Sequence, residues 1–255
     1  MAKKTNYSYV GIAFIILVFG IIFIPKIINR LSNADVVRDD SRSKDVTTHT
    51  IDNKENRDQT GLVYIPTATG EHRKVPAFSF TNQNGKTITN KDYLGKVYIV
   101  EFFFTTCPTI CPRMSRNLVE IQNEFQAFQD DFGVASFTTN PDYDTVDVLQ
   151  AYADKYRITN PNWHLMTGDE ETIYKLSNEG FFMYVAKNDD IEGGFEHSGN
   201  FALIDKEGYI RSRLDANGNP LIYYNGIISE ELGEEDGQQQ QISILKEDIK
   251  VLLNE

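Results

Sequence analysis

The stretch that most constrains how this chain folds is residues 96–104, which read KVYIVEFFF. Apart from the leading lysine and Glu101, every residue in it is β-branched or aromatic. Runs of this composition form central strands that are buried on both faces of a sheet. We therefore predict that residues 96–104 form a central strand of the domain.

Segments with helical and strand patterns alternate along the rest of the chain. Helices are predicted at residues 114–128, 144–156, 170–177 and 241–253, the third capped by Asp169. Strands are predicted at residues 74–80, 87–89, 132–139, 163–166, 181–186, 200–204 and 209–214. Asn84-Gly85 and residues 205–208 mark tight hairpins. This alternation, with its antiparallel ending, predicts an α/β fold with a mixed central sheet flanked by helices.

The N-terminal region has the features of a membrane anchor followed by a linker. Residues 9–25 read YVGIAFIILVFGIIFIP, and lysines or arginines flank them on both sides. Because no small-residue cleavage site follows, we interpret residues 1–31 as an uncleaved transmembrane helix, with a cleaved signal peptide as the alternative. Residues 32–74 are predicted to be a flexible polar tether, and residues 75–255 the folded domain. We expect this domain to face the periplasm or another extracytoplasmic compartment, where disulfides persist.

The charge of the chain bears on its partners. The formal net charge is −12. A nucleic-acid-binding protein needs a basic surface to displace counterions from phosphates, and the sequence has no basic cluster of that kind. The acidic balance also argues against adhesion of the domain surface to anionic lipid. We therefore expect no nucleic-acid partner. We expect the protein to contact a membrane through its N-terminal helix.

The only two cysteines, Cys107 and Cys111, stand four residues apart just after the predicted central strand. A structural disulfide stabilises most when it closes a long loop, so this short spacing favours a chemical role. We predict that Cys107 opens a helix, with Pro108 in its first turn. Unpaired N–H groups at a helix N-terminus favour negative charge, so the pKa of the Cys107 thiol should be lowered.

The spacing of the two sulfurs suits a metal as well as a disulfide. In a regular helix, residues i and i+4 have Cα atoms about 6.2 Å apart, and a disulfide there requires a local change of the backbone. Two thiolates can instead bind a soft cation, Cu(I) or Zn(II), and a third ligand that is a nitrogen favours copper.

Four histidines are candidates for that third ligand. His49 lies in the tether, and His72 precedes the first clear strand. His164 follows a tryptophan in an apolar segment, which is typical of a structural core histidine. His197 lies in the glycine-rich segment GGFEHSGN at 193–200, and functional residues are common in such loops. The residues alone leave His197 open between a ligand and a structural or exposed histidine.

Four segments resemble the Sco/SenC family of copper-handling proteins. They are FFFTTCPTICPRM at 102–114, TNPDYDT at 139–145, NWHLMTGD at 162–169 and EHSGNFALID at 196–205. The first is similar to that family's strand–CPxxCP–helix signature, and the last to its histidine segment. The resemblance extends over about residues 75–224, with Glu196 where the family usually has aspartate.

The resemblance implies a thioredoxin-like fold and a copper ion bound by Cys107, Cys111 and His197. It places a family aspartate near the site, at Asp142. It further implies delivery of copper to the CuA centre of cytochrome c oxidase subunit II, which would then be the partner. Some members of the family also act as thiol–disulfide reductants on that subunit.

Three other functions are compatible with the same residues. In a thiol–disulfide oxidoreductase, Cys107 would be the attacking thiolate and Cys111 the resolving thiol. In a peroxide-reducing enzyme of the thioredoxin superfamily, a cysteine would attack peroxide, although a CxxxC spacing is unusual for that class. A redox or copper sensor is the third alternative.

Overall fold

The computed structural model describes residues 61–188, 190, 193–215 and 217–255. The predicted membrane anchor, the tether up to residue 60 and His49 lie outside the described residues. Within the described ranges, no helix is both long and apolar enough to cross a membrane.

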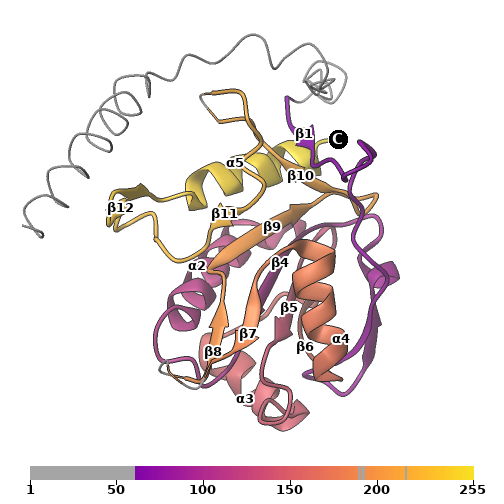
Figure 1. The fold of residues 1–255 in the computed structure, drawn as a ribbon, viewed down its shortest axis with the longest axis vertical. Coiled ribbons are helices and arrows are strands. Elements are labelled where there is room, and N and C mark those ends of the chain that lie inside the picture. Colours follow the sequence, from indigo (N-terminus) through magenta and orange to yellow (C-terminus); the bar gives the residue numbers. More distant parts are fainter. Residues whose placement is uncertain (1–60, 189, 191–192, 216) are drawn as a thin grey trace, which may run out of the picture. The chain divides into compact units, whose positions relative to one another are not determined.

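A mixed sheet forms the centre of the domain (Figure 1). The strand order is β1-β10-β9-β4-β5-β6-β2-β3, and β11 pairs with β9. Strands β4, β5 and β6 are parallel, whereas β9, β10, β1, β2, β3 and β11 pair antiparallel with their neighbours. Their bounds are β1 Val63–Tyr64, β2 Ser79–Asn82, β3 Thr87–Thr89, β4 Val97–Phe103, β5 Phe132–Thr138, β6 Trp163–Thr167, β9 Asn200–Ile204, β10 Ile210–Ser212 and β11 Tyr224–Asn225. The structure confirms the predicted central strand, since every residue of β4 is buried.

Helices cover both faces of the sheet. They are α2 Cys111–Glu124, α3 Val146–Tyr156, α4 Glu170–Lys175 and α5 Ile242–Leu253, with 3-10 turns η1 Asn90–Tyr93 and η2 Gln126–Phe128 and a π-helical turn η3 Leu176–Phe181. Ile99 and Phe103 of β4 pack in the cluster that contains residues of α2, α3 and α5. Val100 and Phe102 pack in the opposite cluster, with α4 and η3. Side chains of a strand alternate between faces, so Glu101 points toward the α2 side.

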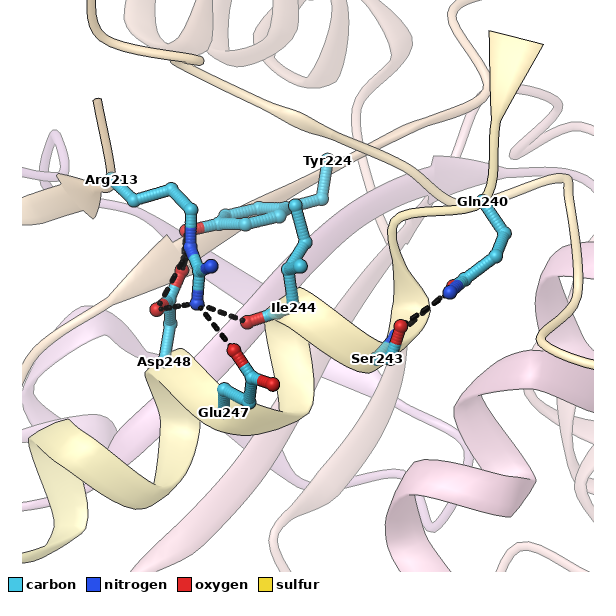
Figure 2. A network of polar contacts seen from close by, with 7 residues as sticks. All are labelled: Arg213, Tyr224, Gln240, Ser243, Ile244, Glu247 and Asp248. Carbon is cyan, nitrogen blue, oxygen red and sulfur yellow. Dashed lines mark hydrogen bonds and ion pairs between the residues drawn. The ribbon is translucent and has the colours of Figure 1, made fainter. Parts of the chain in front are cut away.

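The C-terminal helix α5 is fixed to the sheet by a buried carboxylate (Figure 2). Asp248 is 2% exposed. It accepts hydrogen bonds from Arg213 Nε at 2.9 Å and from Tyr224 Oη at 2.6 Å. Arg213 also donates to the Ile244 carbonyl oxygen at 3.2 Å. These contacts hold α5 against β11 and against the segment that follows β10.

Among the boundaries that differ from the sequence prediction, three change the description of the fold. Residues 63–64, assigned to the tether, form β1 and pair with β10, so the folded domain begins before residue 75. The strand predicted at 74–80 is replaced by β2, because Pro76 lacks an N–H and Lys74 makes only an isolated bridge to Tyr209. The strand predicted at 181–186 begins only at Val185, since α4 continues into η3 and Asn178 there bonds to the backbone of Val185.

Two small hairpins lie outside the main sheet. One consists of β7 Val185–Lys187 and β8 Phe195–His197, and the other of β12 Glu234–Glu235 and β13 Gln238–Gln239. The predicted hairpin around Gly85 is confirmed, as is the N-cap of α4, where Asp169 accepts from the Thr172 amide at 2.9 Å. The short link between β9 and β10 is also confirmed.

Candidate metal centre

The first cysteine lies in the loop between β4 and α2, not within the helix. Helix α2 begins at Cys111, with Pro112 in its first turn, where a missing N–H costs no hydrogen bond. The prediction that Cys107 opens the helix is therefore wrong, and the regular i, i+4 geometry does not apply. The Cys107 sulfur instead accepts a hydrogen bond from the Cys111 amide at 3.4 Å. It thus sits at the N-terminus of the helix, where negative charge is stabilised.

The fold brings the two sulfurs and one imidazole together. His197 Nε2 lies 3.1 Å from Cys111 Sγ and 4.0 Å from Cys107 Sγ. The three potential ligand atoms all lie within 4.8 Å of one another. Both thiols are free, and Cys107 and Cys111 are 7% and 1% exposed. Cys107, Cys111 and His197 therefore form one cluster from segments that are far apart in the sequence.

A strand rather than a loop presents His197. It is the last residue of β8, opposite Val185 of β7. The Phe104 ring packs edge-on against the imidazole, with ring centroids 5.6 Å apart. Gly199 lets the chain pass close to Ile227, because a Cβ there would lie 2.2 Å from Ile227 Cδ1. No strand was predicted at β8, because its three residues are all half-buried and show no alternation.

Hydrogen bonding and burial give the two thiols opposite acidities. The thiol of Cys111, then the His197 ring and the amides of Cys111 and Thr109 stabilise the Cys107 thiolate, which lowers the pKa of Cys107 to about 3. Burial raises the pKa of Cys111 well above its ordinary value, and the neighbouring Cys107 adds to this rise. The pair therefore holds one thiolate and one protonated thiol at neutral pH.

A buried carboxyl group lies on the same side of the sheet as the cysteines. Glu101 is 1% exposed, and its Oε1 accepts a hydrogen bond from Ser136 Oγ at 2.7 Å. Its Oε2 has no hydrogen-bond partner among the described residues. Burial raises the pKa of Glu101 to about 7, and the charge of Glu101 in turn contributes to the raised pKa of Cys111. Glu101 was not among the predicted site residues, although a lone acid within an apolar strand is a signal that the sequence shows.

The structure does not bring Asp142 to the cluster. Its side chain is exposed, and no hydrogen bond or ion pair within the described residues joins it to either cysteine or to His197. The aspartate that contacts the cysteine loop is Asp144, which accepts a hydrogen bond from the Thr105 amide at 3.1 Å.

The remaining described histidines have other contacts. His164 Nδ1 lies 3.1 Å from Asn82 Nδ2, and the ring packs edge-on against Tyr93, which confirms a structural role. The His72 ring stacks on Tyr64 with centroids 4.0 Å apart.

A cleft leads from the surface to the cluster. Its volume is about 440 Å³, and its apolar lining comes from Phe104, Ile110, Tyr184 and Phe195. Cys107 and His197 also line it, so a partner molecule can reach the thiolate from this side.

The donor set fits a soft metal ion. Two sulfurs and one imidazole nitrogen match Cu(I), whereas structural zinc sites have four protein ligands. Within the described residues, the cluster of Cys107, Cys111 and His197 offers three ligand atoms.

A family model described as SCO1/SenC matches residues 66–229, which is more than half of the chain. The chain belongs to the SCO1/SenC family. The match includes all three residues of the cluster, and the family resemblance inferred from the sequence motifs is thereby confirmed.

Curated relatives and solved structures are both similar to this chain, and two of each show the extent of the match. One relative is the SCO1 protein homolog of Bacillus subtilis (29% identity; 62% of this chain, 80% of the relative). Another is a putative copper-binding protein of Stutzerimonas stutzeri (26% identity; 62% of this chain, 76% of the relative). One structure is a SCO1/SenC family lipoprotein of Bacillus anthracis (31% identity, TM-score 0.58; 71% of this chain, 95% of the other). The other is BsSco (25% identity, TM-score 0.57; 71% of this chain, 94% of the other). It is described as having a disulfide switch and as belonging to a family of cytochrome c oxidase assembly proteins.

Proposed function

We propose that this protein is a copper metallochaperone, which binds one copper ion through Cys107, Cys111 and His197 and delivers it to the CuA centre of cytochrome c oxidase subunit II. The observation that carries the proposal is the cluster itself, whose three soft or borderline donor atoms lie within 4.8 Å of one another. The names of the relatives support it, since one is called a copper-binding protein and another belongs to an oxidase assembly family.

The geometry suits reversible capture of the ion. Cys107 is already a thiolate, so it can bind the incoming cation without first losing a proton. Cys111 releases its proton as the ion binds, because a metal-bound thiol is deprotonated. The cleft leaves the Cys107 side open, so ligands of a partner can approach the ion there and take it over.

An anaerobic titration tests the proposal. Cu(I) is added to the domain in competition with a chromophoric chelator, for the wild type and for the C107S, C111S and H197A variants. We expect one ion per wild-type chain and a large loss of affinity in each variant. The matched control is H72A, which removes an imidazole that stacks on Tyr64 away from the sulfurs. Equal affinity in the wild type and H197A would contradict the three-ligand site.

A second function is favoured by the unequal acidities of the two thiols. The Cys107 thiolate would attack a disulfide of the partner, forming a mixed disulfide and releasing one partner thiolate. Cys111 would then pass its proton to the partner thiolate released in the first step and attack Cys107 Sγ, which releases the second partner sulfur as a thiolate and leaves a Cys107–Cys111 disulfide. The two electrons that reduce the partner's disulfide come from Cys107 and Cys111, which are oxidised to their own disulfide. This reaction does not need His197, so reductase activity that survives in the H197A variant would favour it over copper delivery.

We further propose that residues 1–31 anchor the protein in a membrane, with the domain on the periplasmic or extracytoplasmic side. The apolar run at residues 9–25 and its flanking positive charges support this. Protease treatment of intact spheroplasts should remove the domain from the cells. Protection of the domain until the cells are lysed would place it on the inner side instead.

A further inference from the structure

A second aspartate in the loop after β5 is completely buried. Asp144 is 0% exposed and lies two residues beyond the exposed Asp142. Burying a carboxylate is costly unless several hydrogen bonds compensate for the lost water. The contacts of Asp144 therefore indicate what its burial achieves.

The Asp144 carboxylate joins the C-terminal ends of two neighbouring parallel strands. Its Oδ1 accepts a hydrogen bond from Thr105 Oγ1, and its Oδ2 accepts from the Thr105 amide at 3.1 Å and from Thr138 Oγ1. Thr105 follows β4, and Thr138 ends β5. The Thr138 hydroxyl oxygen in turn accepts a hydrogen bond from the Asn140 amide at 3.0 Å. The hydroxyl proton of Thr138 is therefore free to be donated to the Asp144 carboxylate.

This arrangement fixes the start of the loop that carries the first cysteine. Thr105 stands two residues before Cys107, and both its amide and its hydroxyl are held by the same carboxylate. The Cys107 amide then bonds back to the Phe104 carbonyl oxygen at 3.3 Å. A movement of Thr105 would shift the Cys107 sulfur relative to the Cys111 amide, to which it is bonded at 3.4 Å.

We propose that Asp144 is a positioning residue for the metal centre: by holding Thr105, it sets the position of Cys107 Sγ relative to Cys111 and His197. This inference rests on the proposed copper-binding function. Asp144 acts through the loop and need not touch the ion. Groups that orient metal ligands commonly affect affinity about 10–100-fold.

The test compares D144A with D248A in the full chain. Asp248 is a matched control, because it is also a buried carboxylate that accepts several hydrogen bonds, but its partners are Arg213 and Tyr224. We expect D144A to lower Cu(I) affinity about 10–100-fold in competition with a chromophoric chelator, and D248A to keep the wild-type affinity. Equal affinities of D144A and the wild type would overturn the proposal.

A measurement without copper separates this proposal from the proposed function. Amide hydrogen exchange at Cys111 reports its bond to Cys107 Sγ. We expect faster exchange at Thr105 and Cys111 in D144A, with unchanged exchange in α5. If the wild type itself binds no Cu(I), the proposed function fails, and the exchange rates alone decide the role of Asp144. In that case, exchange at Cys111 in D144A that equals the wild-type rate overturns the positioning role.

A pair of milder variants covers the case in which D144A does not fold. T105V removes only the hydroxyl that donates to Asp144, whereas T105S keeps a hydroxyl. We expect weaker copper binding and faster Cys111 exchange in T105V, and wild-type values in T105S. Wild-type behaviour of T105V in both measurements overturns the proposal.

Discussion

Cys111 Sγ lies 3.1 Å from Nε2 of His197, although 86 residues separate the two in the sequence. The contact depends on the β7–β8 hairpin, which brings the imidazole to the N-terminus of α2. It turns a dithiol at a helix terminus into a three-donor cluster. The acidity, the packing and the metal chemistry of this cluster can each be measured.

The first prediction concerns the acidity of Cys107. Its hydrogen bonds lower its pKa to about 3, so it is a thiolate throughout the range from pH 5 to pH 8. In the C111S variant, which keeps a hydroxyl donor at that position, iodoacetamide should alkylate Cys107 at a rate that hardly changes over this range. An ordinary thiol, with a pKa of about 8.5, would react about tenfold faster for each pH unit. A tenfold rise per unit would show that Cys107 is not a stabilised thiolate.

The second prediction concerns Glu101 and the stability of the fold. Its folded-state pKa, about 7, lies above the ordinary value of 4.5, so ionisation is unfavourable in the folded protein. The free energy of unfolding should therefore fall as pH rises from about 4.5 to 7, by up to about 3 kcal/mol for this group.

Urea denaturation of the wild type and E101Q at pH 5 and pH 7.5 checks this. The glutamine variant lacks the ionisation, so its stability should fall less between the two pH values. Burial also raises the pKa of Asp205 to about 6, and this contribution is common to both proteins and cancels in the comparison. Identical pH dependence of the two proteins would contradict the raised pKa of Glu101.

The third prediction concerns the close contact beside His197. A Cβ at Gly199 would lie 2.2 Å from Ile227 Cδ1, so G199A must displace either the Ile227 side chain or the His197 segment. We expect G199A to lower thermal stability, at a cost of about 1–3 kcal/mol, and to weaken copper binding. Adding I227A should recover part of both losses, because it removes the atoms that clash. No recovery in the double variant would show that the contact is not what constrains this segment.

Much of the architecture follows from local sequence patterns. The apolar run of β4 and the alternation of strands and helices were sufficient to predict the mixed α/β sheet, and the spacing of Cys107 and Cys111 marked the site. The helix start was misplaced because Pro108 and Pro112 both fit a first turn, so the local sequence is compatible with a helix from either cysteine.

Other features depend on contacts between distant segments. Asp142 and Asp144 occupy the same turn, and only the hydrogen bonds to Thr105 and Thr138 distinguish the buried residue from the exposed one. Likewise, β8 has no periodic pattern of its own and is defined by its pairing with β7.

The ligands of the metal centre can be measured by X-ray absorption spectroscopy of the Cu(I)-loaded protein. We expect two sulfur scatterers and one nitrogen scatterer around copper in the wild type, and loss of the nitrogen scatterer in H197A. A wild-type spectrum with sulfur ligands alone, unchanged in H197A, would contradict a centre built from Cys107, Cys111 and His197.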